Sequence, residues 1–235
     1  MSEPALHDVS SEPTQVKLTA TGRAMARRMD EAWKAPVFHL TVEADADAWN
    51  AQRSGLQDVT ITDVLLMRCA QALMLHPKVN AHYDADAFAV NQFDRADIGL
   101  AVATERGLLV PVLRGVESLS LEEIASQRRA LVERARTGGL SMDEMQGATF
   151  TVSNLGMFSI VEFDAIVNVP QVAILAVGST QSRLVLKEGE VAQTRVITVT
   201  LTCDHRAVDG ATGAMFLRDL VSAPAANPSN GAQQP

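Results

Sequence analysis

The two residues whose types and spacing best suit acid–base chemistry are His205 and Asp209. They lie in the segment 202–210, TCDHRAVDG, which follows a run at 195–201 where apolar and hydroxyl residues alternate. Such alternation predicts a strand buried on one face, and it places His205 at the mouth of the apolar face. Partial desolvation there disfavours imidazolium and leaves a neutral ring that can accept a proton. His205 is therefore the candidate general base.

Three other residues of this segment admit more than one interpretation. Asp209 supplies a nearby carboxylate, but Asp is also a common helix cap, so the pair could be an ordinary core histidine beside a capping residue. Cys203 shares a strand face with His205, and Cys–His pairs can activate a thiolate. Side chains two positions apart point in parallel, which makes that hydrogen bond awkward. Arg206 either joins the polar network of the loop or is solvated.

Two segments further upstream carry a family resemblance. They are 147–158, GATFTVSNLGMF, and 163–175, FDAIVNVPQVAIL. Together with the segment around His205, they stand in the order and spacing found in the catalytic domain of 2-oxo acid dehydrogenase E2 acyltransferases. The segments 98–104 and 107–112 are similar to the same family. The chain therefore resembles the chloramphenicol acetyltransferase-like, coenzyme A-dependent acyltransferases over nearly all of its length between the tails.

The resemblance implies an α+β fold, a two-layer sandwich of a mixed β-sheet packed with helices. It also implies a homotrimer whose active site is shared, with His205 of one subunit facing Ser153 of the next. Ser153 would stabilise the oxyanion, and Asp209 would hold the loop and the imidazole through a charge-assisted hydrogen bond. On spacing alone Ser153 could equally be a turn serine. His39 departs from the family, which usually has an aromatic residue there, and it is interpreted as a surface or channel-lining residue.

The expected acyl acceptor depends on whether the chain carries a lipoyl domain. No lysine occupies the Asp-Lys-Ala turn of a lipoyl domain; the four lysines are Lys17, Lys34, Lys78 and Lys187. We therefore expect no covalently bound lipoyl group. The favoured hypothesis is a stand-alone enzyme that moves an acetyl group from acetyl-CoA to a hydroxyl of a small-molecule or carrier-bound acceptor, as in tetronate-type natural-product biosynthesis. The alternatives are an E2 core that acylates dihydrolipoyl groups and a non-catalytic scaffold subunit.

Length and composition bound these hypotheses. The 235 residues suffice for one domain, expected at 16–223 between disordered tails at 1–15 and 224–235. A formal net charge of −8 without a basic patch argues against nucleic-acid binding. No apolar run has membrane-spanning length, and the N-terminus is no signal peptide, so a cytoplasmic setting is expected. His76 and His82 lack a third ligand at suitable spacing, so no metal is expected.

The apolar periodicity predicts the main elements. Helices are expected from Thr21 to before Pro36, from a cap at Thr62 to His76, from a capping box at Ser120 to Gly138, and from Gly210 to Val221. Strands are expected at 37–43, 88–90, 98–104, 108–113, from 149, at 172–178 and at 195–201. Four arginines of the third helix are expected on a solvated face: Arg128, Arg129, Arg134 and Arg136. The chain after Val221 has no large apolar residue, so we expect a discrete trimer of about three times 25.2 kDa rather than a cage.

Overall fold

The fold is described from a computed structural model, which covers residues 13–105, 107–187 and 189–222. Most of the two predicted tails lies outside these residues. So does the sequence after Val221 on which the expectation of a discrete trimer rests, apart from Ser222, the last residue of the C-terminal helix. Among the described residues, no helix combines the length and the apolar character needed to cross a membrane.

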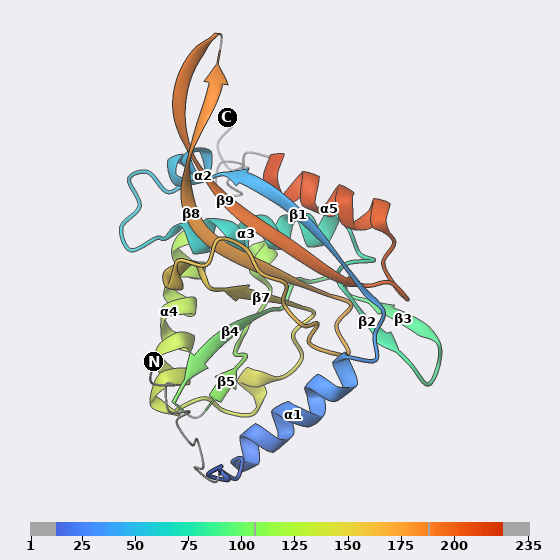
Figure 1. The fold of residues 1–235 in the computed structure, drawn as a ribbon. Coiled ribbons are helices and arrows are strands. Elements are labelled where there is room, and N and C mark those ends of the chain that lie inside the picture. Colours follow the sequence, from blue (N-terminus) through green and yellow to red (C-terminus); the bar gives the residue numbers. More distant parts are fainter. Residues whose placement is uncertain (1–12, 106, 188, 223–235) are drawn as a thin grey trace, which may run out of the picture.

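A seven-stranded mixed sheet forms one layer, with strand order β1-β9-β8-β7-β4-β5 and β6 paired to β4 (Figure 1). The strand β7 runs parallel to both β4 and β8, while the other pairs are antiparallel. A separate two-stranded sheet joins β2 and β3. The bounds are β1 Val37–Asp45, β2 Ala81–Asp84, β3 Ala89–Gln92, β4 Ile98–Thr104, β5 Gly107–Leu109, β6 Val112–Leu113, β7 Phe150–Asn154, β8 Ala173–Lys187 and β9 Glu190–Asp204.

Helices form the second layer and bury the core against one face of the sheet. These helices are α2 Ala46–Gln52, α3 Ile61–Leu75, α4 Leu121–Thr137 and α5 Gly210–Ser222, and α3 contacts each of the other three. The helix α1, Ala20–Ala32, lies apart at the lower edge of the molecule (Figure 1) and buries only Ala32. The predicted α+β two-layer sandwich is confirmed.

The starts of two helices show how the sequence sets the boundaries. Ser120 and Glu123 form the predicted capping box of α4, and Gly138 ends that helix with a φ of 78°. For α3, the predicted cap at Thr62 is wrong. The cap is Thr60, whose backbone N–H and hydroxyl both donate to Asp63 Oδ2 at 2.7 Å.

The solvated face predicted for α4 is corrected at Arg128, whereas Arg129 and Arg136 are exposed as predicted. Arg128 Nε donates to Asp63 Oδ1 at 2.6 Å, and the Asp63 carboxylate is fully buried. A buried carboxylate needs such a partner, because an isolated charge is strongly disfavoured in the interior. Arg128 therefore ties α4 to α3 rather than facing water.

Several strands differ from their predicted form. In β9 the residues on both faces are buried, including Thr198, Thr200 and Thr202, because the hydroxyl-bearing face is covered as well. Pro111 separates β5 from β6, since proline cannot donate to a strand ladder. The strand β2 was not predicted. Both β8 and β9 extend beyond the predicted segments into a long hairpin that projects from the sheet (Figure 1).

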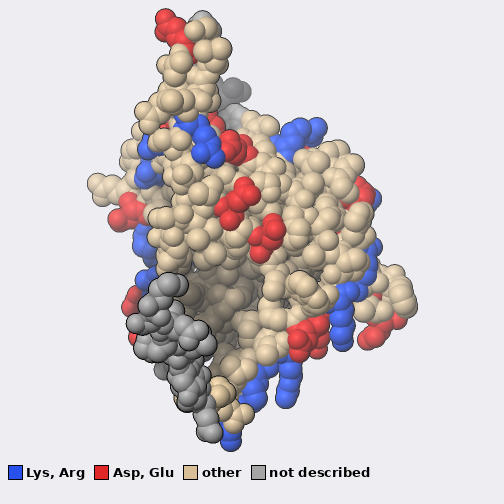
Figure 2. All heavy atoms as spheres, viewed as in Figure 1, with Lys and Arg blue, Asp and Glu red and all other residues tan. Residues whose placement is uncertain are grey.

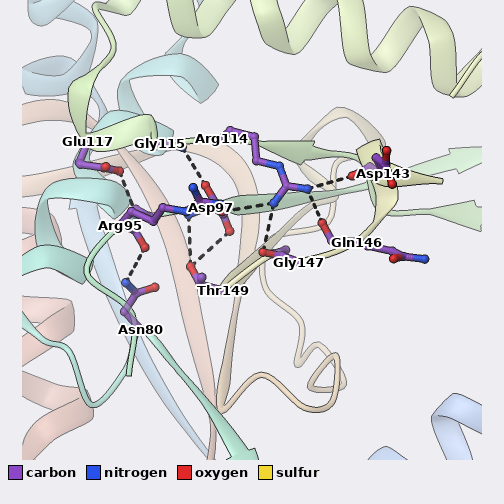
Figure 3. Close-up of polar contacts among 12 residues, drawn as sticks. Asn80, Arg95, Asp97, Arg114, Gly115, Glu117, Asp143, Gln146, Gly147 and Thr149 are labelled. Atoms are coloured by element: carbon purple, nitrogen blue, oxygen red, sulfur yellow. Dashed lines mark hydrogen bonds and ion pairs between the residues drawn. The ribbon is translucent and has the colours of Figure 1, made fainter. Parts of the chain in front are cut away.

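A buried polar cluster fixes the starts of β4 and β7 (Figure 3). The Asp97 carboxylate, 1% exposed, accepts from Arg114 Nη1 at 3.2 Å and from the Gly115 backbone N–H at 2.9 Å. Arg114 Nη2 also donates to the backbone carbonyls of Asp143 and Gln146, just before β7. The backbone N–H of Thr149 donates to the Asp97 carbonyl at 2.8 Å. These bonds set the register that places Ser153 opposite Ala101.

Candidate active site

His205 follows directly after the last residue of β9 and is exposed in the single chain. Its backbone N–H donates to the Pro36 carbonyl at 2.8 Å, and its ring leans against Phe38 with centroids 4.6 Å apart. The apolar face of β9 therefore ends at Cys203, and the predicted partial burial of the imidazole is wrong for one chain alone. The ring is instead available to a molecule, or to another subunit, that approaches the end of the strand.

The residues flanking His205 form a rigid support. The Asp204 carboxylate is 1% exposed and accepts from Arg206 Nη2 at 2.6 Å and from Arg206 Nε at 2.9 Å. The Arg206 guanidinium also lies over the Tyr83 ring, 4.1 Å from its centroid. The hydrogen bond to Asp204 is the main reason why the pKa of Arg206 lies above its usual value. Arg206 is thus part of the loop network and not a solvated side chain.

Asp209 caps the helix that follows the loop. Its Oδ1 accepts from the Thr212 backbone N–H at 2.8 Å, and its Oδ2 accepts from the Thr212 hydroxyl at 3.0 Å. These bonds, the backbone one foremost, hold the pKa of Asp209 below its usual range. Within the described residues no hydrogen bond joins Asp209 to His205. The geometry fits the capping interpretation, in which the carboxylate organises the loop without touching the imidazole.

Ser153 lies near the end of β7, and its hydroxyl makes no hydrogen bond to any described residue. It lines two cavities of about 550 Å³ and about 300 Å³, which also share Ala101 and Leu108. The larger lies between α4 and the strands, and the smaller lies between α1 and the sheet, where the surface in Figure 2 is hollowed. Figure 2 also shows positive side chains gathered over α1. The Ser153 hydroxyl is therefore available to a ligand in either cavity.

Ser153 and His205 do not meet within one chain. Ser153 pairs with Ala176 of β8, whereas Cys203 pairs with Ala173, and β8 separates the two strands. Three residues along a strand and two strand spacings put the α-carbons of Ser153 and Cys203 about 14 Å apart, with His205 further away. The two predicted catalytic side chains therefore do not face each other within one chain.

Burial removes Cys203 from consideration as a nucleophile. The side chain is fully buried, and this desolvation raises the pKa of its thiol to about 12. A thiolate is the reactive form of cysteine, so a thiol with so high a pKa is inert at neutral pH.

The other histidines have structural partners. His76 Nε2 lies 2.8 Å from Asp219 Oδ2, and His82 Nε2 lies 2.9 Å from the Ala148 carbonyl oxygen. His39 is a surface residue with Nδ1 2.9 Å from the Thr202 hydroxyl oxygen. Across the described ranges no group of three potential ligands is placed to hold a metal ion.

Sequence reasoning did not single out three polar residues next to Ser153. Thr151 donates to Gln171 Oε1 at 2.6 Å and accepts from Asn168 Nδ2 at 3.4 Å. Both Thr151 and Asn168 line the smaller cavity. These residues lie within the segments 147–158 and 163–175 that carry the family resemblance. That position was the sequence signal that could have identified them.

The two-layer fold is that of chloramphenicol acetyltransferase, which matches with a TM-score of 0.54 at 15% identity over 83% of this chain and 92% of that one. The protein thus has the chloramphenicol acetyltransferase fold. The chain belongs to the family described as 2-oxoacid dehydrogenases acyltransferase (catalytic domain), whose sequence model matches residues 10–227. The resemblance inferred from the sequence is confirmed.

Among curated relatives, the dihydrolipoyllysine-residue acetyltransferase component of the pyruvate dehydrogenase complex of Zymomonas mobilis is 37% identical over 211 residues. The match covers 86% of this chain and 48% of that protein. This chain spans about half the length of the first curated relatives that it matches.

Among solved structures, dihydrolipoamide acetyltransferase from Azotobacter vinelandii matches with a TM-score of 0.83 at 32% identity, over 92% of this chain and 95% of that one. The cubic core of the pyruvate dehydrogenase multienzyme complex matches with the same values. The Azotobacter structure concerns the catalytic roles of a serine, a histidine and an asparagine. The serine stands fifty-two positions before the histidine, and the asparagine stands four positions after it. Ser153, His205 and Asp209 have the same separations. The last position is Asp here and Asn there.

Proposed function

We propose that this domain transfers an acetyl group between coenzyme A and a thiol of a dihydrolipoyl group, as the catalytic core of an E2 component. The observation that carries the proposal is the Ser153 hydroxyl, which makes no hydrogen bond within the described part of the chain and lines two cavities. In such a transfer two substrates must reach the same carbonyl carbon, and the two cavities that meet at Ser153 provide a route for each of them. The relatives that share the family are dihydrolipoyllysine-residue acetyltransferases, and their names supply the substrate class.

The chemistry needs one base and one oxyanion donor. His205 takes the proton from the acceptor thiol, and the sulfur attacks the acetyl carbonyl carbon of acetyl-CoA. The carbonyl oxygen becomes an oxyanion that accepts a hydrogen bond from Ser153. When the bond to the CoA sulfur breaks, the leaving thiolate receives the proton from the imidazolium. Asp209 and the Asp204–Arg206 pair hold the loop that carries His205.

We further propose that His205 and Ser153 of each site come from different subunits of a trimer. Support comes from their separation in one chain and from the exposed apolar residues beside Ser153, among them Met157, Phe158 and Ile166. His205→Ala should lower turnover by about 10²–10⁴-fold, and Ser153→Ala by about 10²–10³-fold, mostly in kcat.

Mixing the two single variants tests the shared site. In randomly mixed trimers each mixed assembly has one site with both residues, so about a quarter of the unsubstituted activity should return. The double variant mixed with His205→Ala is the control, because no subunit then supplies an intact His205. Activity no higher than that of the separate variants would place both residues in one subunit's site. Near-normal acetyl transfer by a folded His205→Ala protein would refute His205 as the general base.

The hydroxyl acceptor favoured by the sequence alone gains no support from these relatives. That preference rested on the lack of a lipoyl domain in the chain, and a chain half as long as its relatives says nothing about that domain. The test is acetyl transfer from acetyl-CoA to dihydrolipoamide, compared with a panel of small alcohols. Transfer to an alcohol without transfer to dihydrolipoamide would reverse the assignment.

A further inference from the structure

Asn168 lines the smaller of the two cavities that meet at Ser153, and its amide oxygen accepts no hydrogen bond from the residues that the structure describes. Asn168 is half-buried and lines this cavity, whose wall is otherwise mainly apolar. The polar exceptions include Ser153 and Thr151, which lie two positions apart on β7 and therefore face the same side of the sheet. A polar group at this depth of an apolar wall is well placed to orient a ligand.

A chain of hydrogen bonds fixes which way the Asn168 amide points. It starts at the Ala148 carbonyl, which can only accept and which receives Gln171 Nε2 at 3.1 Å. Gln171 Oε1 must then face Thr151, whose hydroxyl donates to it at 2.6 Å. The Thr151 oxygen has used its only hydrogen, so Asn168 must turn its NH₂ group toward it, at 3.4 Å.

The consequence is that Asn168 Oδ1 faces away from Thr151. Within the described residues it accepts no hydrogen bond, and the amide nitrogen keeps a second hydrogen as well. This leaves an acceptor and a donor side by side, the complement of another amide group. Thr151, which accepts from the Asn168 amide, lies about 7 Å along β7 from Ser153.

We propose that Asn168 is a specificity-determining residue that binds the amide of the acceptor, while Ser153 serves the reacting carbonyl at the other end of the cavity. This inference rests on the proposed function. A dihydrolipoyl amide has thiols at one end of a short aliphatic chain and an amide at the other, which matches a mainly apolar cavity that has polar groups at Ser153 and at Asn168. The Asn168 oxygen accepts the amide N–H of the acceptor.

The test compares two acceptors that differ in that N–H. Dihydrolipoamide carries it, and methyl dihydrolipoate keeps the same chain and carbonyl but has none. The unsubstituted protein should prefer the amide by about threefold to tenfold in kcat/KM, the effect of one neutral hydrogen bond. Asn168→Ala should raise KM for dihydrolipoamide by that factor with kcat unchanged, and should leave the ester unaffected.

Ile166→Ala is the matched control, because it alters the wall of the same cavity without touching the amide. It should change both acceptors by the same factor. An amide preference that survives in Asn168→Ala, or that is missing in the unsubstituted protein, would overturn the inference. So would an equal loss for both acceptors, which would make Asn168 a structural residue.

A binding measurement separates this inference from the proposed function. Lipoamide and methyl lipoate, the oxidised forms, cannot accept an acetyl group but can still occupy the cavity. Calorimetry should show a Kd for lipoamide about threefold to tenfold higher in Asn168→Ala, with the ester unchanged. Failure of acetyl transfer to either dithiol would refute the proposed function, whereas equal binding of lipoamide by both proteins would refute the role of Asn168.

Discussion

Removing the Arg206 side chain should destabilise the protein through the carboxylate that it leaves behind. Asp204 accepts hydrogen bonds from both the side chain and the backbone of Arg206. The Arg206→Ala variant keeps only the backbone bond, from the N–H of residue 206 at 3.0 Å. Asp204 is 1% exposed, and stripping a buried charge of its partner costs about 3–5 kcal/mol. The Arg206 side chain is 32% exposed, so water can enter the vacated space and reduce that cost.

Loss of the contact with the Tyr83 ring adds about 0.5–1 kcal/mol. We therefore expect the free energy of unfolding to fall by about 3 kcal/mol. Urea denaturation at one fixed protein concentration measures this change, because assembly would make stability concentration-dependent. Initial rates of acetyl transfer should fall as well, since Asp204 and Arg206 flank His205.

Two further variants make the result interpretable. Arg218→Ala removes an exposed arginine that also pairs with a neighbouring aspartate, and it should cost at most about 1 kcal/mol. Adding Asp204→Asn to Arg206→Ala removes the unpaired charge and should recover part of the lost stability. A cost below about 1 kcal/mol for Arg206→Ala would show that the pair behaves as a surface ion pair and would refute the reasoning.

Three other outcomes are expected. Cys203→Ala should keep acetyl transfer within a few-fold of normal, and iodoacetamide should label Cys203 only after unfolding, because its thiol is buried with a pKa of about 12; complete loss of turnover in a folded variant would make it the nucleophile. Burial lowers the pKa of His82 below its usual 6.5, so the unfolded chain binds the proton more readily and stability should decline as the pH falls below about 6.5. His82→Gln should reduce that decline in urea titrations between about pH 7.5 and pH 5.5, and an unchanged slope would assign it to other groups. Light scattering should report an assembly of at least three subunits, because the proposed site is shared between subunits of a trimer, and an active monomer would contradict that proposal.

Local sequence signals were reliable where the deciding contacts are local. The capping box at Ser120 and the glycine end at Gly138 involve residues within one or two turns, and both were predicted. The strand β4 was predicted with its observed bounds. The start of α3 was missed because Thr60 and Thr62 are equally plausible caps until Asp63 is seen to bond Thr60.

Non-local features escaped prediction for a physical reason. The hydroxyl face of β9 is buried because other parts of the chain cover it, and no pattern within 195–201 carries that information. The exposure of His205 likewise depends on what packs at the end of the strand. The amide chain from Ala148 to Asn168 joins residues twenty positions apart, and its direction follows only from knowing which groups meet.

The central place of β7 in the sheet implies unequal mobility of the two halves of the site. Ser153 belongs to a strand flanked on both sides by parallel neighbours, so its backbone amide can exchange with deuterium only when the sheet opens. His205 stands beyond the end of β9, where its amide is held by the single bond to the Pro36 carbonyl. The backbone amide of Ser153, the proposed oxyanion donor, should therefore exchange more slowly than that of His205, the proposed base, whose amide depends on one hydrogen bond at the end of a strand.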